Sequence, residues 1–282
     1  MKIHQTFLHL KMPQSMDFIV KKQYIFSILY PYLLTKRTKN AIISISAEKN
    51  GENMINILFD CPNIDDFYDD LKPYFSEQTR VAVIAFSFYD DYVKDAKSWE
   101  SVYGEGIGNC YFETVDSLAR FGVKPQNVSF INYFTDTQES AKKKILDADT
   151  VYFTGGLPDR MMDRIRDFDL TDTLASFEGT VIGYSAGAVI QLGEYHLSPD
   201  GDYPDFKYCN GLPYLDGFYL EVHYRGLDSQ NNSIDRVLRE RNAPVYVLHD
   251  HGGGIVVENG KIRTIGHVDV HLPNDNARSI SI

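Results

Sequence analysis

Residues 180–190 read TVIGYSAGAVI, and this stretch decides the fold. An apolar, β-rich run leads to Ser185, which stands between Gly183 and Gly187, and small residues that suit the start of a helix follow it. This G-x-S-x-G arrangement is typical of a sharp turn between a strand and a helix that holds a serine side chain exposed. The stretch therefore predicts a strand–turn–helix unit, in which Ser185 is either a nucleophile or a buried hydroxyl at a tight packing point.

Apolar runs of strand length alternate with helix-length polar segments around this unit. The runs lie at 55–59, 81–87, 128–134, 150–155 and 180–185, and the polar segments at 64–76, 97–121, 137–147 and 158–168. Buried strands at helix-sized spacing imply βαβ crossovers and a parallel sheet with both faces covered. The sequence therefore predicts an α/β fold with three layers, α/β/α, around a mostly parallel central sheet.

Both ends of the chain depart from this alternation. After residue 240 the apolar runs come closer together, and Asn259-Gly260 is a strong signal for a two-residue turn, so we expect C-terminal β-hairpin strands. Residues 1–53 carry a net charge of +5, whereas the remainder carries −16. We expect 1–53 to be an N-terminal extension outside the main fold, whose order the sequence leaves open, and 54–282 to be the main α/β domain.

Composition excludes several classes of protein. The 282 residues are 43% hydrophobic, enough for a large core, and the net charge of −11 disfavours nucleic acid or an anionic membrane surface as a partner. No run approaches the roughly 20 apolar residues that span a bilayer. Cys61, Cys110 and Cys209 are too few and too scattered for a disulfide framework, so we expect free thiols and a cytoplasmic location.

A serine nucleophile needs a base, and His223 is the best candidate. It ends the apolar run of FYLEVHYRG (218–226), which predicts another strand of the sheet, so its side chain can reach the same carboxyl edge as Ser185. His196 lies only 11 positions after Ser185, too near to return to its hydroxyl easily. The positive end of the following helix and the backbone N–H of Ala186 suit an oxyanion at this turn.

Four further histidines raise the alternative of a metal site. They are His249 and His251 in HDHGGG, with His267 and His271 downstream. A histidine pair of this kind is common on strand surfaces, and no carboxylate ligand set is evident beside it. We therefore expect no metal and no other cofactor.

Four motifs taken in order resemble a known family. They are YFTGGLPDRMMDRI (152–165), GYSAGA (183–188), EVHYR (221–225) and VLHDHGGGIVVENGKIRTIG (247–266). Together they resemble the aspartyl dipeptidase and cyanophycinase family of serine peptidases, over about 54–270. The resemblance implies a fold related to the class I glutamine amidotransferases.

The resemblance also implies roles for individual residues. Ser185 matches the nucleophile, His223 its general base, and Gly156 a second backbone donor to the oxyanion. Asp250 matches the acidic position that would orient the histidine. The competing carboxylates are Asp200, Asp202, Glu221 and Glu258.

Substrate recognition is less defined by the sequence. Members that prefer aspartate or an aspartyl backbone need cations near the pocket, for which Arg225, Arg160 and Arg236 are available. After the double glycine the chain has Leu157 and Pro158 where family members usually carry Asn or Gln. This departure leaves open whether the site is catalytically active.

We therefore expect a serine-type peptidase that cleaves a small peptide or an unusual, aspartyl-type amide bond through an acyl-enzyme, as a monomer or homodimer. Two alternatives stay open: an inactive binding or regulatory protein with this fold, and an esterase or other acyl hydrolase with the same triad. An α/β-hydrolase would place its acid before its histidine. A glutamine amidotransferase would need a cysteine at residue 185.

Overall fold

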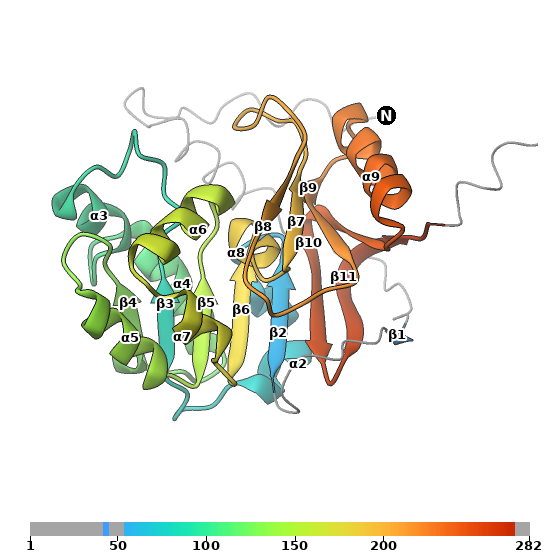
Figure 1. Cartoon of the computed structure of the whole chain (residues 1–282). Coiled ribbons are helices and arrows are strands. Elements are labelled where there is room, and N and C mark those ends of the chain that lie inside the picture. The colour runs from blue at the N-terminus through green and yellow to red at the C-terminus, as the bar shows by residue number, and fades with distance from the viewer. Residues whose placement is uncertain (1–41, 45–53, 274–282) are drawn as a thin grey trace, which may run out of the picture. The chain divides into compact units, whose positions relative to one another are not determined.

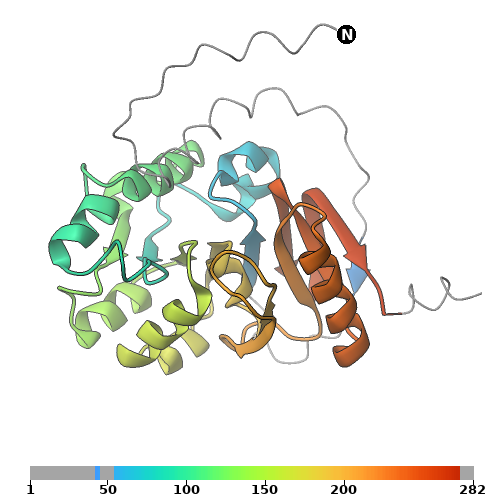
Figure 2. The same cartoon turned by 90° about the horizontal axis from the view of Figure 1, so that it is seen from above.

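The computed structural model describes residues 42–44 and 54–273, which form a β-sheet with helices on both faces (Figures 1 and 2). Within these residues the sheet has nine strands in the order β1-β11-β10-β2-β6-β5-β3-β4, and β9 pairs with β10 off this path. The strands are β1 Ile42–Ser44, β2 Ile55–Phe59, β3 Val81–Ile84, β4 Val128–Ile131, β5 Thr150–Phe153, β6 Thr180–Tyr184, β9 Tyr219–Tyr224, β10 Val245–Glu258 and β11 Lys261–His271. A separate two-stranded antiparallel sheet comprises β7 Glu194–Leu197 and β8 Lys207–Asn210.

The helices connect these strands. The α-helices are α2 Tyr68–Leu71, α3 Ala96–Tyr103, α4 Asn109–Arg120, α5 Gln138–Leu146, α6 Pro158–Asp167, α7 Thr171–Ala175, α8 Ala186–Val189 and α9 Asp228–Arg241, with short 3₁₀ turns η2 Ile64–Phe67, η3 Lys72–Tyr74 and η4 Pro125–Asn127. None of these described helices is both long and apolar enough to cross a membrane.

Five neighbouring strands, β2, β6, β5, β3 and β4, are mutually parallel, which confirms the predicted mostly parallel sheet. The strand at 55–59 has its predicted bounds. The next three apolar runs leave the sheet two or three residues early, because the chain turns there into the loops at the carboxyl edge. The loops after β3 and β5 contact each other through Ser87 and the Gly155-Gly156 turn, which lies against Ser185.

Alternate residues of β2 show how both faces of the sheet are buried. Leu58 packs in one apolar cluster with side chains of α5, α6 and α7, whereas Ile57 and Phe59 pack in another with Leu118 of α4. Seen from above, α2 and α4 lie on one side of the sheet, and α5–α7 and α9 lie on the other (Figure 2). The predicted three layers are thereby confirmed.

The predicted helical segment 97–121 is two helices. Helix α3 ends at Tyr103 and α4 begins at Asn109. Three glycines separate them, and Gly106 has a φ of +70°, which is outside the helical region and costs glycine little. The break therefore follows from these local glycines, which the prediction from helix-length polar segments did not take into account.

The C-terminal strands β10 and β11 form the predicted antiparallel hairpin. At its turn Asn259 and Gly260 have φ of +50° and +68°, as a type I′ turn requires. Of the predicted extension 1–53, the structure describes Ile42–Ser44, which pair antiparallel with β11 and so join the edge of the sheet. The rest of that prediction lies outside the described residues.

Candidate active site

Ser185 occupies a strained turn between β6 and α8. Its backbone has φ 53° and ψ −115°, a conformation that costs a non-glycine residue about 1–3 kcal/mol. Its N–H donates to the carbonyl oxygen of Phe59 on the neighbouring strand β2, at 2.9 Å. The serine is half-buried, so its hydroxyl is not sealed beneath packed side chains.

The flanking glycines are required by close contacts. A Cβ at Gly183 would lie 2.2 Å from the carbonyl oxygen of Gly187, and one at Gly187 would lie 2.3 Å from that of Phe153. Both distances are too short for any side chain. Helix α8 therefore starts pressed against β5 and β6, which holds the serine turn above the sheet's carboxyl edge.

His223 lies within hydrogen-bonding distance of this serine. Its Nε2 is 2.8 Å from Ser185 Oγ, and its side chain is 41% exposed, which leaves room for a ligand. The backbone at His223 is also strained, with φ 53°. Two bonds hold it there: its N–H donates to Asp60 Oδ1 at 2.5 Å, and its carbonyl accepts from Gln230 Nε2 at 3.0 Å.

The carboxylate nearest to the other imidazole nitrogen belongs to Asp60. His223 Nδ1 is 3.0 Å from Asp60 Oδ1, and Asp60 is fully buried. Asp60 directly follows β2, whose last residue Phe59 is in register with Tyr184, the residue before Ser185. The parallel register therefore sets the acidic residue and the serine side by side on neighbouring strands.

Asp250, the predicted acidic partner, lies farther from the histidine. Its nearest oxygen is 3.9 Å from His223 Nδ1, and it forms an ion pair with Arg225 at 3.0 Å. Burial alone would lower the pKa of His223. The hydrogen bond to Asp60 raises that pKa, and so do the negative charges of Asp60 and Asp250. These effects outweigh burial and the positive charge of Arg225, so the pKa of His223 is raised above its ordinary value.

The Gly155-Gly156 turn lies against the serine. A Cβ at Gly155 would be 3.2 Å from that of Ser185, and Gly156 has φ +140°, with Ser87 too close for a side chain. Ser87 fixes the turn, because its hydroxyl donates to the Gly155 carbonyl at 2.5 Å and its carbonyl accepts from Leu157 N–H at 2.7 Å. Among the described residues, neither the N–H of Gly156 nor that of Ala186 donates to a backbone carbonyl.

A search against protein-family models matches residues 109–265, more than half of the chain, to peptidase family S51. The chain belongs to peptidase family S51. As a member of that family, it is a serine-type peptidase.

Two solved structures have a fold similar to that of this S51 peptidase. A putative peptidase E protein from Listeria monocytogenes EGD-e is 15% identical, with a TM-score of 0.50, and the match covers 78% of this chain and 98% of that one. A peptidase from an acI-B1 Actinobacterium is 14% identical, with a TM-score of 0.53, and the match covers 79% and 92%. No curated protein matches the sequence. At these identities the likeness concerns the fold alone.

The three candidate substrate-binding arginines of the S51 peptidase differ in their surroundings. Arg225 forms an ion pair with Asp250, whose carboxylate also lies 3.9 Å from Nδ1 of the catalytic candidate His223. Arg160, on α6, pairs with Asp90 at 3.5 Å. Arg236, on α9, pairs with Glu240 of its own helix and lies 4.3 Å from the ring of Phe206. Of the three, Arg225 is linked to the serine–histidine pair, through the carboxylate of Asp250.

The competing carboxylates have other partners. Glu221 is buried and bonds to His196 Nε2 and Ser198 Oγ, at 2.8 and 2.7 Å. Asp200 accepts two backbone N–H bonds of its own turn, and Asp202 accepts from the Tyr89 hydroxyl. Glu258 accepts from the Tyr74 hydroxyl at 3.4 Å. None of these contacts involves His223.

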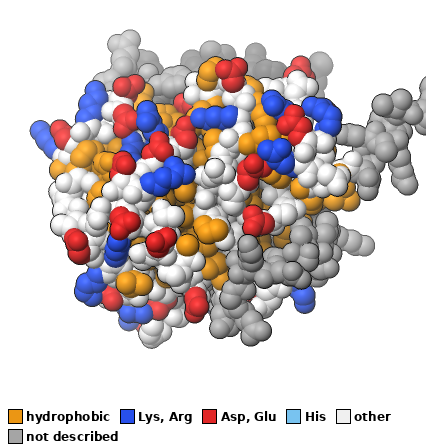
Figure 3. All heavy atoms as spheres, in the orientation of Figure 1, with side chains coloured by type: hydrophobic (Ala, Val, Ile, Leu, Met, Phe, Trp, Pro, Cys, Tyr) orange, Lys and Arg blue, Asp and Glu red, His pale blue; other side chains and the backbone are white. Residues whose placement is uncertain are grey.

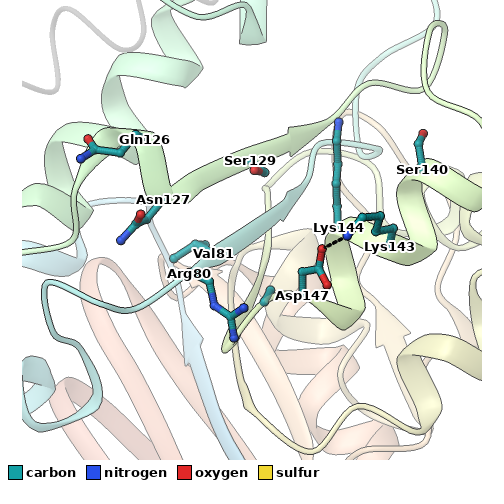
Figure 4. A pocket seen from close by; sticks show the side chains of 10 residues that line it. Arg80, Val81, Gln126, Asn127, Ser129, Ser140, Lys143, Lys144 and Asp147 are labelled. Carbon is teal, nitrogen blue, oxygen red and sulfur yellow. Dashed lines mark hydrogen bonds and ion pairs between the residues drawn. The ribbon is translucent and has the colours of Figure 1, made fainter.

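Charged side chains of the described residues also lie on one face of the molecule and around a cavity away from Ser185. On the face in Figure 3, cationic and anionic side chains are interspersed and form no continuous basic patch. A cavity of about 350 Å³ lies where β3 and β4 begin, at the sheet edge opposite Ser185 (Figure 4). Its cations are already paired, Arg80 with Asp149 at 2.8 Å and Lys143 with Asp147.

Asp60 is the site residue that the sequence analysis did not single out. It lies 125 residues before Ser185 and outside the span matched by the family model. A signal was present, because Asp60 is the first charged residue after the buried strand at 55–59. The residues that follow parallel strands meet at one edge of the sheet. The position of Asp60 after its strand could therefore have indicated it as a site residue.

Proposed function

We propose that Ser185, His223 and Asp60 form the catalytic triad of this peptidase. The observation that carries the proposal is the continuous chain of contacts from Ser185 Oγ to His223 Nε2, at 2.8 Å, and from His223 Nδ1 to Asp60 Oδ1, at 3.0 Å. In this arrangement the buried carboxylate fixes the imidazole tautomer with Nδ1 protonated. Nε2 is then free to accept the serine proton.

Hydrolysis proceeds in two stages. Ser185 Oγ attacks the peptide carbonyl carbon as its proton passes to His223 Nε2, and the carbonyl oxygen becomes an oxyanion held by the N–H groups of Gly156 and Ala186. The imidazolium then protonates the leaving amine, the C–N bond breaks and an acyl-enzyme remains. Water, deprotonated by His223, attacks the ester and releases the acid and the serine.

Asp250 has a different role in this proposal. Its ion pair with Arg225 and its distance from Nδ1 favour Asp60 as the orienting carboxylate. Asp250 instead fixes the position of Arg225 two residues beyond the general base. We infer that Arg225 presents its remaining N–H donors to an acidic group of a short peptide, in keeping with the resemblance to aspartyl dipeptidases.

Labelling combined with a dipeptide panel tests this function. A fluorophosphonate probe is expected to form one adduct, at Ser185, detected by peptide mass mapping, because only an activated serine reacts readily. Among matched substrates, Asp-Leu is expected to be cleaved faster than Asn-Leu, which differs by one charge, and than the corresponding ester. An absence of labelling and of turnover would support the inactive alternative, and preference for the ester the acyl hydrolase.

The pH profile provides a further prediction. The pKa of His223 is raised above 6.5, so the histidine stays protonated, and inactive as a base, up to a higher pH than free imidazole. We expect kcat/KM to fall as pH decreases, through an acidic limb centred above pH 6.5. Initial rates between pH 5 and 9 at fixed ionic strength measure this limb. A limb centred below 6.5 would contradict the proposed coupling of His223 to Asp60.

A further inference from the structure

A second cluster of histidine and carboxylate groups lies on the C-terminal hairpin, apart from the serine–histidine pair. His249 of β10 and His267 of β11 stack face to face, with ring centroids 3.5 Å apart and planes 13° apart. His249 Nε2 is 2.7 Å from Asp269 Oδ2. One donor atom from each of these three residues lies within 4.8 Å of the other two.

The backbone holds this cluster in place through a bulge. The β10–β11 pairing is regular up to Leu248 opposite Val268, and resumes at Gly253 opposite Gly266. The irregular residues between Leu248 and Gly253 include His249, and such a bulge redirects side chains. The glycines fit closely, since a Cβ at Gly253 would lie 2.4 Å from the His267 carbonyl oxygen. The site is therefore built on a fixed part of the sheet.

We propose that His249, His267 and Asp269 form a binding site for a divalent transition-metal ion of the zinc type. Two imidazole nitrogens and one carboxylate oxygen are a ligand set that zinc uses, with water completing the coordination. The carboxylate that the sequence did not pair with these histidines is Asp269, two residues after His267. The site shares no residue with the proposed triad.

The local chemistry suits a cation. The carboxylate of Asp269 places a negative charge within 4.8 Å of a ring nitrogen of each histidine. Zinc–ligand bonds of about 2.0–2.2 Å at a tetrahedral angle separate the ligand atoms by about 3.3–3.6 Å. Binding therefore requires that the rings rotate out of parallel, so that both lone pairs point at one ion, and that the 2.7 Å contact between His249 and Asp269 lengthens. His267 and Asp269 are exposed, so the ion has access.

The test is a direct binding measurement on the full chain. Isothermal titration with Zn²⁺ is expected to show one saturable site, and Co²⁺ is expected to give visible absorption bands that Zn²⁺ displaces. His267→Gln is expected to weaken binding at least about tenfold, since even the loss of groups that only support ligands costs about 10–100-fold. His249→Gln is expected to weaken zinc binding in the same way.

Two control variants identify the site. His271→Gln changes a histidine on the same strand, about 13 Å from His267 at the usual rise of β-strands, and should bind zinc as the unmodified chain does. His223→Gln should also retain binding, because His223 lies in the other cluster that could hold an ion, with Asp60 and Asp250. The proposal is overturned if the chain shows no saturable binding, if His267→Gln retains it, or if His223→Gln alone abolishes it.

Discussion

Changing Ser185 to alanine is expected to lower kcat for an accepted dipeptide by about 10⁶-fold, the order of loss known for removal of the serine from a catalytic triad. The physical reason is the loss of Oγ, the atom that forms the acyl-enzyme and that lies 2.8 Å from His223 Nε2. The oxyanion donors and the substrate contacts stay, so some activity above the uncatalysed rate is expected to persist.

The measurement for Ser185→Ala is steady-state hydrolysis together with fluorophosphonate labelling, and both are expected to be lost. The alanine keeps the backbone of the turn, so thermal unfolding should change little. Ser176→Ala is the matched control, because Ser176 is exposed and its hydroxyl bonds only to its own helix, at Thr173. Full activity in Ser185→Ala, after contaminating peptidases have been excluded by labelling, would remove the proposed mechanism.

Asp60→Ala is expected to have the next largest effect, a loss of about 10⁴-fold in kcat, whereas Asp250→Ala should stay within about tenfold. The buried Asp60 carboxylate stabilises the imidazolium that forms when His223 takes the serine proton, at 3.0 Å from Nδ1. Asp250 is farther away and mainly faces Arg225. Comparing kcat and KM of the two variants on one dipeptide decides between the two carboxylates.

Asp60→Asn separates this electrostatic role from a structural one. The amide oxygen can still accept the bond from the His223 backbone N–H, so the fold is retained while the charge is lost. Because Asp60 raises the pKa of His223, the acidic limb of kcat/KM should move to lower pH in this variant, along with the fall in rate. An unchanged limb, or a larger loss from Asp250→Ala, would assign the orienting role to Asp250 instead.

Local pattern predicted much of the fold and part of the site. The apolar run at 55–59 and the Asn259-Gly260 turn were read correctly, because burial and backbone sterics act over a few residues. The helix break at Gly104–Gly108 was missed, although the signal there is also local. The contact of His223 with Ser185 followed from placing both at the carboxyl ends of predicted strands.

The sequence by itself indicated that Ser185 stands on a strained turn, because the strand before it and the flanking glycines are local signals. The tertiary structure alone decided which carboxylate meets His223. Asp60 reaches it because β2, which precedes Asp60, and β9, which carries His223, both pair with β10. The same holds for Asp269 and the two stacked histidines, which meet through a bulge between β10 and β11. Contacts of this kind depend on strand order and register, which are set by packing the whole chain and not by any short stretch of it.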